Sequence, residues 1–201
     1  MSRVTSIEEL SNLKSKIETE RKFTKQVLIC GGTGCISSGS NEIADKMTEK
    51  VKAAGKENEI RVIKTGCFGF CEKGPIVKML PDNTFYTEVT PEDADRLVET
   101  HLLKEEKIEE LLYVDPVTKN KISDSDHMDF YKKQERVALR NCGVIDPENI
   151  EDYLLHDGYT ALDKVLKMSQ QEVVDIMKDS GLRGRGGGGF PTGLKWQFAL
   201  N

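Results

Sequence analysis

The chain has 201 residues, a length that suits one large domain or a medium-sized domain with a second piece. Its 34 acidic residues outnumber 29 Lys and Arg, and the net charge of −5 excludes a general binder of the nucleic-acid backbone, which needs a concentrated cationic face. The 37% hydrophobic and 31% charged residues, with no membrane-length apolar run and no signal-peptide core at the start, are typical of a globular protein of the cytoplasm. A disordered chain and a membrane protein are excluded.

Residues 1–104 alternate between helix-like and strand-like patterns, which indicates an α/β domain. Ser6 and Glu9 form a capping-box pair ahead of the first helical run. The predicted elements are a helix at 6–17, a strand at 27–29, a helix at 41–54, strands at 60–65, 76–80 and 85–89 with a turn at 81–83, and a helix at 90–102. This set closes within roughly one hundred residues, a normal size for an independent domain.

Residues 105–201 show mainly helical patterns. The charged stretch 104–110 is predicted to be a linker that leads out of the first domain. The helices expected after it are one that holds Phe130 and Val137 and ends at Gly143, one that opens at Asp146-Pro147, and one that Ser169 and Glu172 cap and that runs to Gly181. These helices have no predicted sheet to pack on, so we expect them to begin a larger domain whose remainder lies outside this chain.

Four of the five cysteines stand as two spaced pairs, each directly after a predicted strand. Cys30 and Cys35 form C-x4-C, and Cys67 and Cys71 form C-x3-C, with glycines crowding both loops. Because thiols stay reduced in the cytoplasm, these four are more plausibly metal ligands than disulfide partners. The fifth, Cys142, stands at a predicted helix end, where we expect burial rather than ligation.

Three interpretations of the four cysteines are open. Four thiolates from two loops can hold either a tetrahedral zinc ion or an iron–sulfur cluster. Structural zinc sites favour tighter spacings, commonly C-x2-C, whereas a 2Fe-2S cluster is wider and needs backbone N–H groups near its sulfurs, which glycine-rich loops supply. The third interpretation is that the cysteines pack as small apolar side chains. The spacing and the glycines favour the 2Fe-2S cluster.

The same residues resemble a known family. The two cysteine pairs and the flanking sequence TGCFGFCEKGP are similar to the thioredoxin-like 2Fe-2S ferredoxin domain of complex I-type NADH dehydrogenases and of NAD-linked electron-bifurcating hydrogenases and formate dehydrogenases. The resemblance covers residues 1–104. It implies a thioredoxin-like α/β fold with both cysteine loops at one end of the sheet. It also implies Cys30, Cys35, Cys67 and Cys71 as the ligands of a 2Fe-2S cluster.

Residues 181–196, GLRGRGGGGFPTGLKW, are too rich in glycine for a helix interior or an ordinary strand. The segment is either a flexible linker or a loop that comes very close to a ligand, and its cations and aromatic residues argue against a linker. Successive glycine N–H groups beside cations can bind phosphate. Two generic phosphate-binding motifs fail here, because a Rossmann fingerprint needs a preceding strand and Leu194 stands where a P-loop needs lysine.

This segment, together with NCGVIDPENIEDYLLHDGYTAL before it, resembles the FMN- and NADH-binding loop of the flavoprotein subunit of the same enzymes. Residues 105–201 are therefore expected to be a linker and the N-terminal part of an α/β flavin-binding domain. The resemblance implies that FMN is contacted by Gly184, Arg185, Gly186, Gly187 and Lys195, and that NAD(H) lies near Phe190 and Phe198. In the family this domain continues far beyond the loop and carries a 4Fe-4S cluster, so we expect this chain alone to bind FMN weakly or not at all.

The sequence thus predicts the N-terminal portion of an electron-transfer subunit of an NADH:acceptor oxidoreductase. Hydride would pass between NAD(H) and FMN, and single electrons between FMN and iron–sulfur clusters, without a catalytic side chain in this portion. Fusion of the two domains favours a multi-subunit cytoplasmic bifurcating hydrogenase or formate dehydrogenase over an NADH:quinone oxidoreductase. The other hypotheses are a stand-alone 2Fe-2S electron carrier and a zinc-stabilised assembly module.

Overall fold

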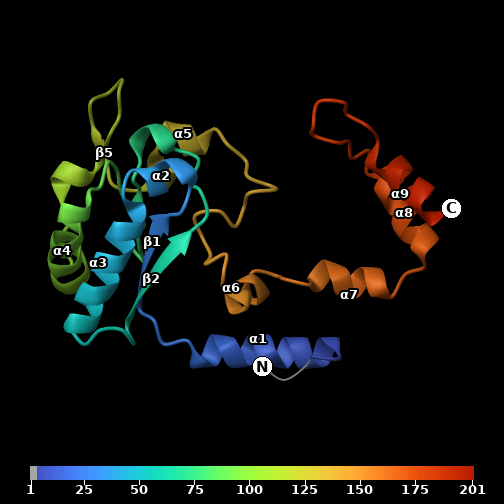
Figure 1. Cartoon of the computed structure of the whole chain (residues 1–201), viewed down its shortest axis with the longest axis horizontal. Coiled ribbons are helices and arrows are strands. Elements are labelled where there is room, and N and C mark those ends of the chain that lie inside the picture. The colour runs from blue at the N-terminus through green and yellow to red at the C-terminus, as the bar shows by residue number, and fades with distance from the viewer. Residues whose placement is uncertain (1–3) are drawn as a thin grey trace. The chain divides into compact units, whose positions relative to one another are not determined.

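The computed structural model describes residues 4–201, which form two compact units (Figure 1). One unit is Asn12–His156, and the other takes in Asp157–Asn201 and the start of the chain up to Ser11. The helices are α1 (Ile7–Glu20), α2 (Thr33–Ser37), α3 (Ser40–Ala53), α4 (Ala94–Arg96), α5 (Asp129–Lys132), α6 (Ile150–Leu155), α7 (Thr160–Leu166), α8 (Gln170–Asp179) and α9 (Thr192–Leu200). The strands are β1 (Lys25–Cys30), β2 (Ile60–Thr65), β3 (Val77–Leu80), β4 (Thr84–Tyr86), β5 (Tyr113–Val114) and β6 (Lys121–Ile122).

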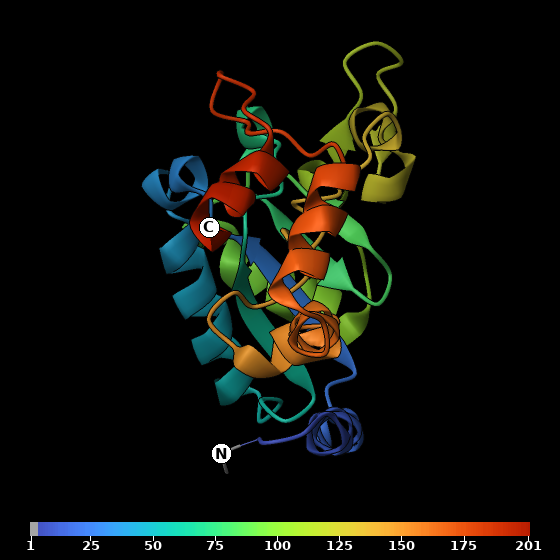
Figure 2. The same cartoon turned by 90° about the vertical axis from the view of Figure 1, so that its right-hand side faces the viewer.

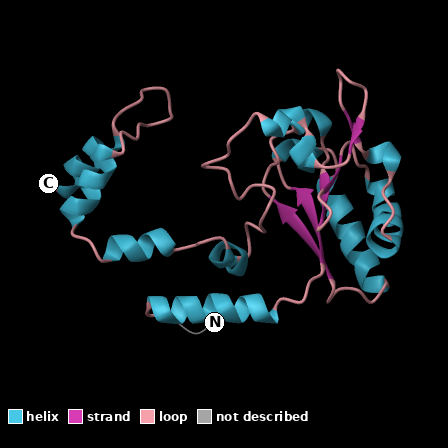
Figure 3. Cartoon of the chain, turned by 180° about the vertical axis from the view of Figure 1, so that it is seen from behind, coloured by secondary structure: helices cyan, strands magenta, loops and turns pink. Residues whose placement is uncertain are grey.

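A four-stranded mixed sheet in the order β2-β1-β3-β4 forms the centre of the first unit (Figure 3). β1 runs parallel to β2, with Cys30 opposite Thr65 at their last residues, and antiparallel to β3. Because parallel strands end at the same edge of a sheet, the loops that follow β1 and β2 leave from one edge. This topology brings the two cysteine loops, which begin 37 residues apart in sequence at Cys30 and Cys67, to the same end of the sheet.

The strands predicted at 27–29, 60–65 and 76–80 are confirmed, whereas the strand predicted at 85–89 corresponds to β4 and already ends at Tyr86. Alternate side chains of β1 enter two separate cores. Val27 and Ile29 face α3 and the helical segment 91–102, whereas Leu28 and Cys30 face the opposite core. The first core also contains Ile43, Met47, Val51, Val77, Met79, Tyr86, Leu97 and Val98. The second contains Cys35, Ile63, Phe68, Ile76, Phe85, Tyr113 and Met128. The cysteine end of β1 is thus anchored in a packed interior.

Segment 104–110 is not a linker, which corrects the prediction from its charge. Ile108 is fully buried within this stretch, and the chain beyond it runs along the edge of the sheet. Thr87 N donates to Leu111 O at 2.9 Å, and Phe85 N donates to Ser123 O at 2.7 Å. The charged side chains lie on the outer side while the apolar ones pack inward. The compact unit therefore continues past residue 104, the predicted domain boundary, to His156.

The helix expected to hold both Phe130 and Val137 is also wrong. α5 ends at Lys132, and the chain from 133 to 149 is a series of turns. The backbone and side chains of this segment contact the second cysteine loop instead of continuing a helix. The helix expected to open at Asp146-Pro147 begins later as α6, where Asn149 Oδ1 accepts from Glu151 N at 2.9 Å.

In the second unit, α8 and α9 pack side by side (Figure 2). The capping box predicted at α8 is confirmed, since Ser169 Oγ accepts from Glu172 N at 3.3 Å and the Glu172 carboxylate accepts from Ser169 N at 2.8 Å. α9, which the glycine-rich sequence did not predict, comes so close to α8 that a Cβ on Gly193 would lie 2.5 Å from Lys178 N. Among the described residues, none of the helices is both long enough and apolar enough to cross a membrane.

Candidate functional site

The four spaced cysteines meet at the end of the sheet where β1 and β2 stop. Cys30 is the last residue of β1, and Cys35 lies on the short helix α2 that follows; both are buried. Cys67 follows β2 and is half-buried, and Cys71 opens a short 3-10 helix, Cys71–Lys73, and is exposed. The structure thus brings together the residues that the sequence pattern selected.

Two glycines bring the backbone against the sulfurs. A Cβ on Gly32 would lie 3.0 Å from Cys67 Sγ and 3.5 Å from Cys30 Sγ, so Gly32 contacts one thiol of each pair. A Cβ on Gly74 would lie 2.6 Å from Cys35 Sγ. A side chain at either position would occupy the space between the two cysteine loops. The close approach of backbone to sulfur is what a metal–sulfur cluster needs for hydrogen bonds to its sulfur atoms.

The thiols interact as two neighbouring pairs. Cys67 Sγ and Cys71 Sγ are 3.9 Å apart, and Gly69 N donates to Cys67 Sγ at 3.3 Å. Burial, then the hydrogen bond and charge interaction with Cys30, raise the pKa of the Cys35 thiol to about 12. The hydrogen bond with Cys67 raises the pKa of Cys71. Without metal, these two groups are protonated at neutral pH, and metal binding would release their protons.

The donor set fits a binuclear cluster. Two thiolate pairs are what two irons with two protein ligands each require, and Cys is the ligand type that iron–sulfur clusters use. Within residues 4–201, no group of three or more His, Cys, Asp or Glu side chains is placed to hold a single metal ion. The pairing of the thiols, the glycines between the loops and the N–H group directed at Cys67 Sγ are the features that match a cluster.

The structure adds residues to this site that sequence patterns did not select. Tyr131 OH donates to Phe68 O at 3.1 Å, and the Arg136 guanidinium donates to the same carbonyl oxygen. Cys142, expected at a helix end, lies in a turn, half-buried, and a Cβ on Gly66 would be 3.2 Å from its Sγ. No local signal in residues 130–143 marks these contacts, because their partners lie more than sixty residues earlier in the chain.

The glycine-rich segment forms a closed loop between α8 and α9. Gly184 N donates to Phe190 O at 2.9 Å, which joins the two arms of the loop and leaves 185–188 exposed at its tip. Gly187 adopts a φ of +98°, a conformation that favours glycine. Gly186 and Gly188 are not in that region, and within the described chain a Cβ on either would meet nothing within 4 Å. The packing of this chain therefore does not explain why these two positions are glycine.

Of the other residues of the expected flavin site, Arg185 and Phe190 lie in this loop, and Lys195 and Phe198 lie on α9, which follows it. Arg185 is at the exposed tip, and Lys195 is exposed on the first turn of α9. Phe190 and Phe198, expected near NAD(H), expose 52% and 67% of their surface. Glycine N–H groups with two nearby cations fit a phosphate-bearing ligand, and exposed aromatic rings fit a planar one.

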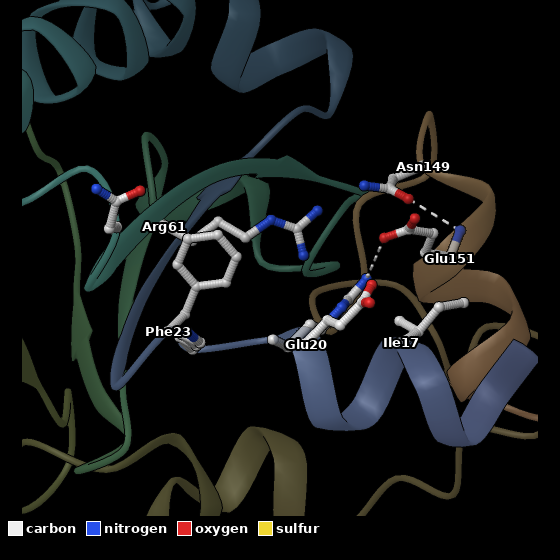
Figure 4. A pocket seen from close by; sticks show the side chains of 9 residues that line it. Ile17, Glu20, Phe23, Arg61, Asn149 and Glu151 are labelled. Carbon is white, nitrogen blue, oxygen red and sulfur yellow. Dashed lines mark hydrogen bonds and ion pairs between the residues drawn. The ribbon is translucent and has the colours of Figure 1, made fainter.

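A hollow of the first unit lies away from the cysteines. A pocket of about 680 Å³ lies between the end of α1, β2 and the start of α6, and its lining includes Phe23, Arg61, Asn149 and Glu151 (Figure 4). It contains none of the predicted site residues. Its charged walls are held by ion pairs, including Arg21 Nη2 to Glu151 Oε2 at 3.8 Å. The pocket is a consequence of how α1 and α6 meet the sheet rather than part of the cysteine site.

Comparisons with known proteins match this picture. Residues 3–102 match the family model described as thioredoxin-like [2Fe-2S] ferredoxin. The 2Fe-2S ferredoxin of Clostridium pasteurianum is 36% identical over 77 residues, which are 38% of this chain and 76% of that protein. The NADP-reducing hydrogenase subunit HndC of Solidesulfovibrio fructosivorans is 65% identical over 69 residues, which are 34% of this chain and 14% of that protein. An NADH-quinone oxidoreductase subunit of Aquifex aeolicus is 56% identical over 52 residues, 26% of this chain and 12% of that protein.

These matches confirm the thioredoxin-like fold expected for the first part of the chain, with a mixed sheet followed by a helical region. They also confirm the resemblance to subunits of NAD(P)-linked redox complexes. The matched segments span only a small part of the hydrogenase and quinone oxidoreductase subunits.

Proposed function

The chain belongs to the thioredoxin-like [2Fe-2S] ferredoxin family, and from this we propose that Cys30, Cys35, Cys67 and Cys71 together hold its 2Fe-2S cluster. The observation that carries the proposal is the meeting of these four thiols at one end of the sheet, where Gly32 of the first loop lies against Cys67 of the second. When bound, the cluster would accept and release one electron at a time.

The cysteines do not contribute equally to this site. Cys30 and Cys35 are 1% and 2% exposed, so they hold their side of the site inside the second core, away from water. Cys71 is exposed, which leaves its side open to an electron donor or acceptor. We infer that electrons enter and leave on the side of the Cys67–Cys71 loop. The rate of electron transfer falls steeply with distance, and a partner on the buried side would be separated from the cluster by the second core.

For the C-terminal unit we propose one wall of an FMN site. Gly184, Arg185, Gly186, Gly187 and Lys195 would hold the phosphate and ring system of FMN, and Phe190 and Phe198 would border NAD(H). The unexplained Gly186 supports this proposal, since its missing side chain leaves room for a ligand that this chain does not contain. When bound, FMN would exchange hydride with NAD(H) and single electrons with iron–sulfur clusters.

The protein as a whole is proposed to be an electron-transfer subunit of a multi-subunit NAD(P)H-linked oxidoreductase. The 65% identity to a subunit that is named as part of an NADP-reducing hydrogenase favours a hydrogenase, of the bifurcating kind, over formate dehydrogenase or NADH:quinone oxidoreductase. Further iron–sulfur subunits would be its partners, and a 4Fe-4S cluster would be a further cofactor of the complex. Its location would be the cytoplasm.

A stand-alone electron carrier is the second candidate. It is favoured by the match to a clostridial 2Fe-2S ferredoxin, 76% of whose length this chain covers. The glycine-rich loop distinguishes the two functions, because a simple carrier has no use for a phosphate-binding loop.

The cluster proposal is tested on anaerobically isolated protein. We expect iron and acid-labile sulfide in equal amounts, two of each per chain, visible absorption, and an EPR signal of a binuclear cluster after reduction. A colourless protein that contains zinc, or one that remains free of iron after chemical reconstitution, would contradict the proposal.

The flavin proposal is tested by Gly186→Val in the protein as isolated with its partner subunits. Because a Cβ at this position meets nothing within the described chain, the loop should fold normally. The substitution should therefore weaken only the binding of FMN. We expect at least a tenfold weaker retention of FMN, measured by flavin fluorescence after release, a loss of about 1.4 kcal/mol or more of binding free energy. The iron content serves as the internal control and should be unchanged; unaltered flavin content would contradict this role of the loop.

A further inference from the structure

Arg136 lies against the loop that joins Cys67 to Cys71. Its guanidinium donates through Nη2 to Phe68 O and through Nη1 to Cys142 O at 3.4 Å. It also borders the next residue of the loop, since a Cβ on Gly69 would lie 3.4 Å from Arg136 Nη2. One side chain thus links the backbone of the second cysteine loop to the turn at Cys142.

The Phe68 carbonyl is held from a second direction. Tyr131 OH donates to it at 3.1 Å, and the Arg136 guanidinium lies over the Tyr131 ring at 5.0 Å from the ring centre. The ring therefore supports the guanidinium by a cation–π contact while its hydroxyl shares the same acceptor. Both groups come from the segment for which the sequence predicts one helix that ends at Gly143.

Close backbone contacts show that this segment encloses the loop. A Cβ on Gly143 would lie 2.7 Å from the ring of Phe68, and a Cβ on Gly66 would lie 3.2 Å from Cys142 Sγ. The side chain of Phe68 is 4% exposed. Residues 131–143 therefore pack on the loop immediately before and after Cys67, and a shift of this segment would move that cysteine.

Among the described residues, Arg136 forms no ion pair with a carboxylate. Its hydrogen bonds go to carbonyl oxygens. Lys73, the other cation close to the loop, is paired with Glu88 at 3.5 Å. The guanidinium is half-buried, so water screens its charge less than that of a fully exposed cation.

We propose that Arg136 positions the Cys67–Cys71 loop and raises the reduction potential of the 2Fe-2S cluster. This inference rests on the four-cysteine cluster proposed above. Reduction adds one negative charge to the cluster, and a nearby fixed cation stabilises the reduced form more than the oxidised form. Gly69 connects Arg136 to the cluster site. Its backbone borders the guanidinium, and its N–H group donates to Cys67 Sγ at 3.3 Å.

The test compares Arg136→Gln and Arg136→Lys with the unaltered protein, using a redox titration followed by EPR. We expect the midpoint potential of Arg136→Gln to shift to more negative values, and that of Arg136→Lys to remain close to the original because the charge is kept. The potential is measured on the fraction that carries the cluster, so partial loss of cluster does not prevent the comparison. A broadened or shifted EPR signal in Arg136→Gln would report the altered position of the loop.

Arg140→Gln is the matched control, since Arg140 is an exposed arginine in the same segment and the substitution removes the same charge. Its potential should shift much less than that of Arg136→Gln. Equal potentials for Arg136→Gln and the unaltered protein, or equal shifts for Arg136→Gln and Arg140→Gln, would overturn the inference. An unaltered protein without any cluster would instead contradict the four-cysteine proposal, so the two failures are distinguishable.

Discussion

Cys67→Ala is expected to remove the 2Fe-2S cluster almost completely, whereas Cys142→Ala should leave it in place. Cys67 Sγ lies 3.9 Å from Cys71 Sγ and faces Gly32 between the two loops, so its removal leaves one iron with a single protein ligand. Water is a hard oxygen ligand, whereas iron–sulfur centres prefer soft thiolate ligands, so water is a poor substitute for the missing cysteine. Iron and sulfide analysis with visible absorption measures the effect, which should be a loss of most of the cluster.

The two substitutions are well matched as a test. Cys67 and Cys142 are both half-buried, and each change to alanine removes one sulfur atom. The effects of the two substitutions on packing should therefore be similar. Cys142 Sγ lies against Gly66, one residue before Cys67, which makes it the most informative negative control. Full cluster content in Cys67→Ala, or cluster loss in Cys142→Ala, would show that the ligand set is not the one proposed.

Asp152→Asn is expected to destabilise the first unit by about 3 kcal/mol at pH 7, because it breaks a buried ion cluster by removing the charge of one partner. Asp152 is 3% exposed, and its carboxylate accepts from Arg21 Nη2, from Arg61 Nη1 at 2.8 Å and from Asp146 N at 2.8 Å. An asparagine of the same size would leave two arginines without their shared acceptor charge. The free energy of unfolding, from urea denaturation followed by circular dichroism, measures the loss.

Glu20→Gln is the matched control for this substitution. Glu20 pairs with Lys16 at 3.8 Å, and its side chain is 67% exposed, so the same chemical change should cost about 1 kcal/mol or less. A loss in Asp152→Asn no larger than that in Glu20→Gln would show that the buried cluster does not hold α6 to the sheet.

The contribution of Asp152 should also depend on pH. Burial alone would raise the pKa of this carboxyl, but hydrogen bonds from Arg61, Asp146 N and Arg21 outweigh burial and hold the pKa below 3.8. A lowered pKa in the folded state means that the stabilisation is complete above the unfolded value, about 3.9, and is lost as the pH falls through the folded value. The difference in stability between the unaltered protein and Asp152→Asn should therefore shrink below about pH 4. Unfolding measured for both at pH 7 and pH 3 tests this, and a difference that grows in acid would contradict it.

Local patterns in the sequence determined the strands and the candidate ligands. Alternating apolar residues placed β2 at Ile60–Thr65, and the cysteine spacing with its glycines selected the four residues that meet at the end of the sheet. The capping box of α8 could likewise be predicted from Ser169 and Glu172, because these two residues are only three positions apart in the sequence. Signals of this kind depend on short-range contacts, so they are present in the sequence itself.

Only the tertiary structure decided what residues 104–156 do. Charge alone suggested a linker at 104–110, yet the burial of Ile108 places this stretch on the sheet. Arg136 acts on Phe68, 68 residues away in sequence, and Asp152 pairs with Arg21 at a separation of 131. A single arginine or aspartate produces no periodic pattern, and its role depends on partners that the folded chain brings near from a distance. For this reason the candidate ligands could be selected from the sequence, whereas the residues that surround them in the fold could not.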